Sequence, residues 1–193
     1  MTASKGRLRG RELLEVLLLF TGHNGLLRIG ELLCGLQVSD VIWDSDLLGF
    51  QIFLERTKTG RSGPGVYVAF RDHGSISAVS LMRDWFDDND LWSCHTSHIF
   101  PSSRGGEFDF SKTMSQDHFR KVIAAWTHSI GLDSTKYSGH SLRAGGATDL
   151  FTMRVPYYII KKMGRWVSDA ALCYYRDDED VIVSVTEAFG GCY

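Results

Sequence analysis

Two cationic side chains stand three residues apart in the segment SGHSLRAGGATDL (138–150). If this segment is a helix, His140 and Arg143 lie one above the other on the same face. Both side chains can donate hydrogen bonds to an anion, and the planar guanidinium of arginine suits two oxygens of a phosphate group. A single His-x-x-Arg pair is also typical of an ordinary solvated helix face. It therefore indicates phosphate chemistry only together with other residues.

The same segment contains two adjacent glycines, Gly145 and Gly146. Each costs about 1 kcal/mol relative to alanine in a helix interior. Their small size lets another helix come close. We predict that they pack this helix against the one that bears Arg28, and that leucine at position 145 destabilises the domain.

Two further sites of charge lie at predicted junctions between elements. Arg28 interrupts an apolar stretch directly after a glycine-rich break, and Glu31 follows it three residues later. A local ion pair is the simplest interpretation of these two residues. Lys58 lies in the predicted turn TKTGRSGPG (57–65), where it is either an ordinary surface lysine or a mobile cation delivered by the turn.

Aromatic residues follow the helix in the segment GRWVSDAALCYYR (164–176). Trp166 comes after a glycine, and Tyr174 and Tyr175 lie on the next short helix. Tyrosines in a helix usually pack in a core or an interface. A phenolic oxygen can also form a covalent intermediate when neighbouring charges activate it.

Hydrophobic periodicity predicts the elements that must position these side chains. The predicted fold class is α+β, mostly helical, with a small antiparallel three-stranded sheet. Ser75 is the predicted cap of the third helix, and residues 180–189 are compatible with either strand or helix. The expected helices are 12–20, 26–36, 75–88, 114–131, 138–150, 156–164 and 168–176, the expected strands are 41–44, 47–56 and 65–70, and a long polar loop is expected over 95–111.

Composition limits the possible classes of protein. The chain has 193 residues, of which 44% are hydrophobic and 23% charged, as in a soluble globular domain. It contains no apolar run long enough for a membrane span. The formal net charge of −2 argues weakly against a nucleic-acid-binding protein. Because acidic residues collect in DDND (87–90) and DDED (177–180), a basic face can still exist elsewhere.

The cysteines predict free thiols in a reducing compartment. They lie far apart without a CxxC pair, and no metal or other cofactor is expected. The group Cys94, His95 and His98 lacks a second pair of ligands at zinc-finger spacing and is more typical of a loop. The four cysteines are Cys34, Cys94, Cys173 and Cys192.

The order of the motifs is more informative than any one of them. An arginine in GLLRIGELL, a lysine in a β-turn, His-x-x-Arg, and Gly-x-Trp followed eight or nine residues later by tyrosine resemble the tyrosine recombinase (phage integrase) family. The form HSLRAGGAT…GRWVSDA…YYR looks most like the eukaryotic branch carried by crypton-type mobile elements. The resemblance extends from about residue 10 to residue 180.

The resemblance implies the catalytic-domain fold of that family and a metal-independent phosphoryl transfer. A tyrosine attacks the scissile phosphate of DNA, a 3′-phosphotyrosyl bond forms, and the 5′-hydroxyl of a partner strand reverses the step. Since no metal participates, cationic side chains must stabilise the transition state. The catalytic residues implied are Arg28, Lys58, His140, Arg143, Trp166 and Tyr174, with Glu31, Arg165 and Tyr175 in support.

The resemblance also implies a role for each residue. The two arginines clamp the non-bridging oxygens, Lys58 is the general acid for the leaving 5′-hydroxyl, and His140 orients the phosphate while Glu31 supports the site. Two choices stay open. Tyr174 fits the family spacing from Gly164, whereas spacing from the tryptophan favours Tyr175. Arg165, rather than Trp166, takes the sixth position in one alignment.

The domain expected is a basic tail (1–10) followed by the catalytic domain (11–193), without the N-terminal core-binding domain of the family. Phosphate contacts supply most non-specific affinity, so DNA binding by this chain should be weak. The expected partners are double-stranded DNA and, in an active synapse, further copies forming a tetramer. We expect an intracellular protein, nuclear if eukaryotic. The rival functions are a non-catalytic DNA-binding relic of a mobile element and a type IB topoisomerase-like activity.

Overall fold

The computed structural model describes residues 7–55, 65–73 and 76–175, and these form two compact units that divide after Gly146. The first unit contains helices α1 (Gly10–Asn24), α2 (Ile29–Leu32), α3 (Ala78–Asp88) and α4 (Gln116–Ser129), the 3₁₀ turns η1 (Val38–Asp40), η2 (Leu91–Ser93) and η3 (Ser134–Lys136), and strands β1 (Val41–Trp43), β2 (Gly49–Leu54), β3 (Val66–Arg71), β4 (Pro101–Arg104) and β5 (Glu107–Thr113). Helix α5 (Gly139–Thr152) begins in the first unit and ends in the second, which also contains α6 (Tyr157–Met163) and the 3₁₀ helix η4 (Asp169–Tyr174).

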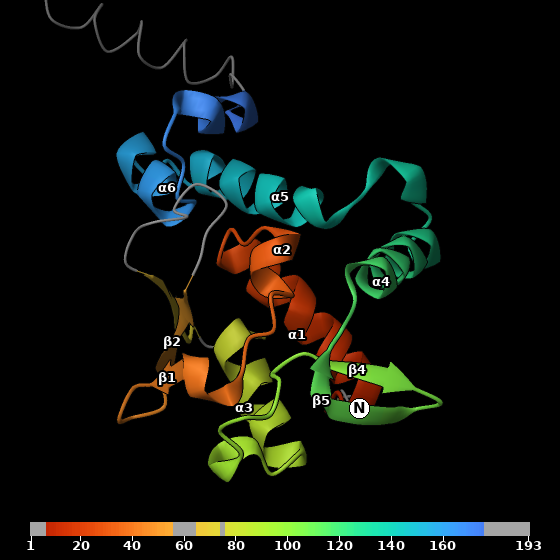
Figure 1. Cartoon of the computed structure of the whole chain (residues 1–193). Coiled ribbons are helices and arrows are strands. Elements are labelled where there is room, and N and C mark those ends of the chain that lie inside the picture. The colour runs from red at the N-terminus through yellow and green to blue at the C-terminus, as the bar shows by residue number, and fades with distance from the viewer. Residues whose placement is uncertain (1–6, 56–64, 74–75, 176–193) are drawn as a thin grey trace, which may run out of the picture. The chain divides into compact units, whose positions relative to one another are not determined.

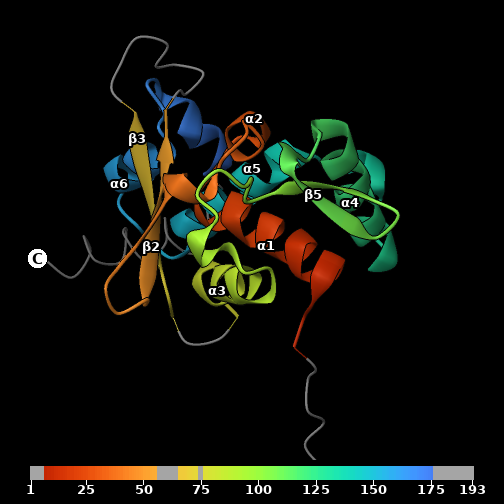
Figure 2. The same cartoon turned by 60° about the horizontal axis from the view of Figure 1, so that its bottom comes forward.

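Helix α1 runs through the middle of the first unit (Figures 1 and 2). The three-stranded sheet lies on one side of it, and α4 with the β4–β5 hairpin lies on the other, while α3 packs beside it. The helix is apolar on most of its surface, as predicted for residues 12–20, and its leucines form the centre of the core. Those fully buried are Leu13, Leu14, Leu17 and Leu18.

The sheet has the order β1–β2–β3 and is antiparallel throughout, which confirms the predicted small sheet and the α+β class. Phe50 and Phe70 pair across β2 and β3, and their rings stack with centroids 4.7 Å apart. Strand β2 starts at Gly49, where only glycine fits because the backbone is crowded. A Cβ at this position would lie 2.5 Å from Asp44 Oδ2 and 2.9 Å from the Phe70 carbonyl oxygen.

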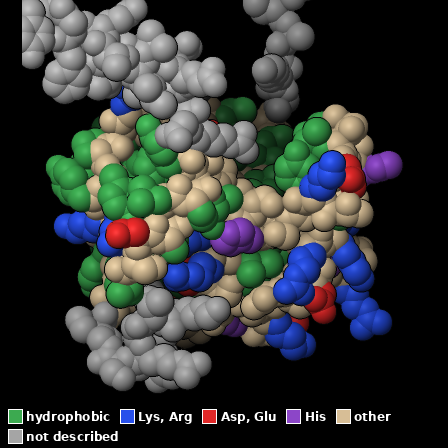
Figure 3. Space-filling view, turned by 90° about the horizontal axis from the view of Figure 1, so that it is seen from above, with side chains coloured by type: hydrophobic (Ala, Val, Ile, Leu, Met, Phe, Trp, Pro, Cys, Tyr) green, Lys and Arg blue, Asp and Glu red, His purple; other side chains and the backbone are tan. Residues whose placement is uncertain are grey.

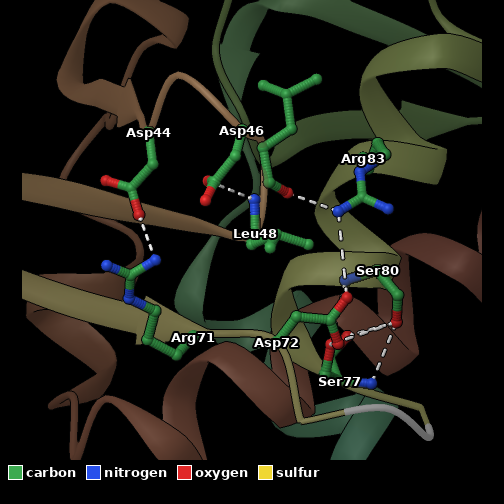
Figure 4. Close-up of polar contacts among 9 residues, drawn as sticks. Asp44, Asp46, Leu48, Arg71, Asp72, Ser77, Ser80 and Arg83 are labelled. Carbon is green, nitrogen blue, oxygen red and sulfur yellow. Dashed lines mark hydrogen bonds and ion pairs between the residues drawn. The ribbon is translucent and has the colours of Figure 1, made fainter.

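A polar network fastens the sheet to the start of α3 (Figure 4). Arg83 donates to the carbonyl of Leu47 at 2.5 Å, and its guanidinium lies 3.9 Å from Asp72. Ser77 donates to Asp72 at 2.9 Å and accepts from the backbone N–H of Ser80 at 3.0 Å. Ser77 is therefore the residue that caps α3. The predicted cap, Ser75, lies outside the described residues.

The prediction of a long loop over 95–111 is wrong. Residues 101–104 and 107–113 form the hairpin β4–β5, whose two-residue turn is Gly105-Gly106. Both glycines have positive φ, at 64° and 92°, which a tight hairpin turn requires and which glycine adopts without strain. The sequence pattern does not indicate this hairpin, because β4 is almost entirely polar and lacks the apolar alternation of a strand. The apolar pair before the hairpin, Ile99 and Phe100, is buried in the core.

The segment 26–36 is also less helical than predicted, since α2 covers only Ile29–Leu32. Leu26 has a positive φ of 48°, and Gly35 has a φ of 95°, so the chain turns sharply on both sides of α2. The apolar spacing predicts a longer helix because Leu26 and Leu36, which lie in the loops on either side of α2, are also buried in the core. Within the described ranges, every helix is too short or too polar to cross a lipid bilayer.

Candidate active site

Arg28 is the N-cap residue of α2, and a glutamate one turn later holds its side chain. Glu31 Oε1 accepts from the Arg28 guanidinium at 2.6 Å, and Glu31 Oε2 accepts from the Arg28 backbone N–H at 3.0 Å. The Glu31 side chain is 4% exposed and that of Arg28 is 24% exposed. The local ion pair predicted from the sequence is present. Because the buried carboxylate holds both the backbone and the side chain of Arg28, it fixes the direction of the guanidinium.

Arg143 is buried with an exposure of 2%, which is rare for an arginine. Its Nη1 donates to the carbonyl oxygen of Leu26 at 2.6 Å. Leu26 is in the left-handed region, a conformation that leucine rarely adopts and that is common at functional sites. The carbonyl that receives Arg143 belongs to the residue two before Arg28. The guanidinium of Arg143 therefore lies at the start of α2.

The first turns of α5 pack closely on α1 and α2. A Cβ added to Gly139 would lie 2.9 Å from the Ile29 side chain, and one added to Gly22 would lie 3.0 Å from Leu142. His140 follows Gly139 directly and its side chain is exposed. This packing brings the segment with Arg28 and Glu31 close to the segment with His140 and Arg143. The two segments are far apart in the sequence.

The glycine pair allows α5 to approach the end of α1 closely, and Gly146 is the residue at the closest point. A Cβ at Gly146 would collide with the carbonyl oxygen of His23 and lie 2.7 Å from Leu26 Cδ2. A Cβ at Gly145 would meet the His23 ring at an ordinary 3.6 Å. Gly146 is therefore the tighter position of the pair, and its neighbours are His23 at the end of α1 and Leu26 rather than α2. The destabilisation by leucine at position 145 stays a prediction.

Lys58 lies outside the described residues, between β2 and β3. Of the predicted residues in the first unit, the structure thus brings together the arginines, Glu31 and His140. The site atom that the sequence does not reveal is the Leu26 carbonyl, because no pattern in the sequence predicts a left-handed leucine.

The predicted aromatic residues lie in the second unit. Trp166 folds back over Gly164, where a Cβ would collide with the indole ring, so glycine is required at the end of α6. Arg165 has a positive φ of 57° and donates to the Met163 carbonyl at 2.8 Å. The Trp166 ring lies against that of Tyr174, with centroids 5.9 Å apart.

The two tyrosines have different surroundings. Tyr174 is half-buried, and its carbonyl accepts from the Thr148 hydroxyl at 3.3 Å. Tyr175 is 43% exposed, and its ring lies edge-on to Phe151 with centroids 5.3 Å apart. Of the two, Tyr174 is the one beside Trp166.

The described residues also show where surface charge, cysteine thiols and potential metal ligands lie. On the face shown in Figure 3, lysine and arginine side chains are prominent and acidic ones are sparse, despite the negative net charge. Cys34, Cys94 and Cys173 are free thiols, while Cys192 lies outside the described residues. Among the residues that the structure describes, no group of three or more His, Cys, Asp and Glu side chains could hold a metal ion.

Residues 3–181 match the model of the phage integrase family. A curated relative, the integrase/recombinase xerD homolog of Selenomonas ruminantium, is 24% identical over 166 residues, which are 85% of this chain and 47% of that protein. The chain therefore spans about half the length of the curated relative that it matches.

Solved structures share the fold at low sequence identity. The XerH site-specific recombinase bound to palindromic difH substrate has a TM-score of 0.70 at 17% identity, over 96% of this chain and 48% of that one. The pre-cleavage XerH complex has a TM-score of 0.66 at 16% identity, over 95% of this chain and 49% of that one. A lambda integrase dimer bound to a COC′ core site has a TM-score of 0.54 at 20% identity, over 92% of this chain and 51% of that one.

Proposed function

The chain belongs to the phage integrase family, and on that premise we propose that it cleaves and rejoins DNA at specific sites through a 3′-phosphotyrosyl intermediate. The observation that carries this proposal is the buried Arg143 beside the Arg28–Glu31 pair. The two guanidinium groups at the start of α2 concentrate positive charge in one place. Positive charge held in a fixed position supports stabilisation of a phosphoryl-transfer transition state.

In the proposed reaction, Arg28 and Arg143 hold the non-bridging oxygens of the scissile phosphate. The Tyr174 phenol loses its proton to the surrounding water, and its oxygen forms a bond to phosphorus as the bond to the 5′-oxygen breaks. Lys58 donates a proton to that 5′-oxygen, and His140 orients the phosphate. In the reverse step, a 5′-hydroxyl attacks the phosphotyrosyl bond and releases the tyrosine. The arginines replace the charge that metal ions supply in other phosphoryl transfers.

The choice of Tyr174 rests on its position between Trp166 and Thr148. The proposed sixth residue is Trp166, since its ring contacts that of Tyr174, while Arg165 donates to a nearby backbone carbonyl instead. Tyr175 packs against Phe151 and is proposed as a supporting residue.

A nicked suicide DNA substrate tests the proposal, because loss of the short strand beyond the nick traps the covalent adduct. We expect an adduct with the wild-type chain and with Tyr175→Phe, and none with Tyr174→Phe. An adduct that disappears only with Tyr175→Phe would reverse the assignment. DNA binding without any adduct or plasmid relaxation would instead favour the non-catalytic relic.

We further propose double-stranded DNA as the partner and self-association into a tetramer on DNA. Light scattering of the chain with and without a duplex that contains its site would measure this association. The assignment to the eukaryotic crypton-like branch, with a nuclear location, is a proposal that rests on the form HSLRAGGAT…GRWVSDA…YYR. Its test is the source genome: flanking sequences of a mobile element in a eukaryote are expected, and a bacterial chromosome would contradict it.

A further inference from the structure

The proposed nucleophile lies at the last residue of η4, an element that cannot fix its own position. This 3₁₀ helix has six residues, and Ala171 is its buried residue. Helices of this length are marginal by themselves, so their geometry depends on contacts with neighbouring elements. The position of Tyr174 therefore depends on what holds η4 within the second unit.

The start of η4 is held by a carboxylate that receives two donors from α6. Asp169 Oδ1 accepts from the Lys161 ammonium at 2.6 Å and from the Tyr157 hydroxyl at 2.8 Å. Tyr157 and Lys161 are four residues apart, so they project from successive turns of the same helix face. Two donors on one oxygen constrain the direction of the Asp169 side chain more than a single contact would.

Helix α6 is a firm support for this contact. Ile160 is fully buried, and the Tyr157 ring stacks on Phe151 of α5 with centroids 6.3 Å apart. The hydrogen bonds from Lys161 and Tyr157 lower the pKa of Asp169, so its carboxylate stays charged to a lower pH than an unpaired aspartate does. The other end of η4 is held through the Tyr174 carbonyl, by Thr148.

We propose that Asp169 is a positioning residue for strand cleavage, because its contacts with Tyr157 and Lys161 fix the start of η4 and thereby the place of the Tyr174 phenol. This inference rests on the proposed function. A contact so exposed adds little to global stability. A displacement of the reacting oxygen by about 1 Å, however, can reduce a rate by up to 100-fold. Loss of Asp169 should therefore affect the rate of cleavage far more than folding.

The chain contains a matched control in Asp109 of β5. This carboxylate is also exposed, accepts from the hydroxyl of Ser111 at 2.5 Å and forms an ion pair with Lys112 at 3.1 Å. It resembles Asp169 in charge and partners but lies on the β4–β5 hairpin. Asp109→Ala therefore controls for the loss of one exposed, paired carboxylate.

The experiment measures the single-turnover rate of adduct formation on the nicked suicide substrate at saturating protein. We expect a rate about tenfold lower for Asp169→Ala, an intermediate rate for Asp169→Asn, and a change within twofold for Asp109→Ala. Asparagine can still accept from Tyr157 but loses its charge opposite Lys161. The thermal midpoints of all variants should stay close to that of the wild type.

DNA affinity separates positioning from an effect on binding. Removing a negative charge strengthens or leaves unchanged the attraction to phosphates, so weaker binding is not expected for Asp169→Ala. The double variant Asp169→Ala with Lys161→Met should cleave no more slowly than the slower single variant, since both remove the same contact.

The outcomes distinguish a failure of the role proposed for Asp169 from a failure of the proposed function. A wild-type rate for Asp169→Ala, or a decrease that Asp109→Ala matches, overturns the role of Asp169 and leaves the proposed function intact. If the wild-type chain itself forms no adduct on the DNA site flanking its own gene, the proposed function fails and this inference fails with it.

Discussion

The two regions that contribute the proposed site are constructed differently. In the first unit, Arg143 and Glu31 are buried, and each binds a backbone group at the start of α2. In the second unit, Tyr174 lies at the end of a short 3₁₀ helix whose fixed points are exposed polar contacts. The proposed phosphate-binding arginines are thus buried or held by a buried carboxylate, whereas the proposed nucleophile lies on a short element held by few contacts.

This difference agrees with the separate tasks of the proposed arginines, which must be held rigidly, and of the proposed nucleophile, which must move during the reaction. A charge-stabilising group is most effective when it is oriented before the reaction begins. A nucleophile that must attack, stay bonded to DNA and be released can lie on an element of low local stability. Substitution of Arg143 or Glu31 should therefore change stability and activity together, whereas substitution of Asp169, which holds the start of η4, should change activity alone.

Replacing Arg143 with methionine should have the largest effect. The substitution leaves the buried Leu26 carbonyl without its arginine donor, which costs about 1–3 kcal/mol of unfolding free energy. Loss of one charge-stabilising donor also lowers a rate by about 100- to 1,000-fold. Chemical denaturation and adduct formation measure the two effects. A stable, active variant would contradict the account of the first unit.

Substitutions of the paired glycines should differ sharply. Gly146→Ala places a methyl group against the His23 carbonyl, and overpacking of this kind costs about 1–3 kcal/mol. Gly145→Ala finds ordinary contacts and should be neutral, or stabilising by up to about 1 kcal/mol through helix propensity. Thermal unfolding of the two variants compares them directly, and equal midpoints would refute the packing account.

Glu31→Gln should have an intermediate effect. The amide can still accept from the Arg28 backbone N–H but loses its charge beside the guanidinium. Hydrogen bonds to charged groups contribute about 1.5–3 kcal/mol, so we expect stability to fall within that range. We also expect cleavage to slow by about tenfold, because the Arg28 guanidinium loses its fixed orientation. Unchanged cleavage in a destabilised variant would limit Glu31 to a structural role.

Tyr175→Phe should have the smallest effect. The Tyr175 ring packs edge-on against Phe151, and phenylalanine retains that ring contact. We expect adduct formation within twofold of the wild-type rate and an unchanged thermal midpoint. Loss of the adduct would move the nucleophile to Tyr175.

Short-range patterns in the sequence were sufficient for most elements. The apolar helix at 12–20, the three short strands and the boundaries of α6 at Pro156 and Gly164 follow from local periodicity and from proline and glycine. The hairpin β4–β5 was missed because polar residues interrupt its strands. The turn Gly105-Gly106 is the signal that would have revealed it.

For the proposed site residues, the local contact was predictable but the tertiary contacts were not. Arg28 and Glu31 pair locally, so spacing alone suggests their contact. The contact of Arg143 with Leu26 depends on the tertiary packing of α5 and on a leucine in a left-handed conformation, neither of which the sequence shows. The same is true of Gly146, because only the position of His23 distinguishes it from Gly145.

The central claim is that two arginines stabilise the charge on the scissile phosphate, and a neutral phosphate tests it most directly. A methylphosphonate at the cleavage position lacks one charged non-bridging oxygen and needs less positive charge for the transition state. We predict that folded Arg143→Met cleaves the ordinary phosphodiester about 100- to 1,000-fold more slowly than the wild type and forms the Tyr174 adduct on the methylphosphonate with a much smaller loss of rate. Cleavage of the phosphodiester at the wild-type rate by this variant, or failure on both substrates while the wild type cleaves both, would contradict the account.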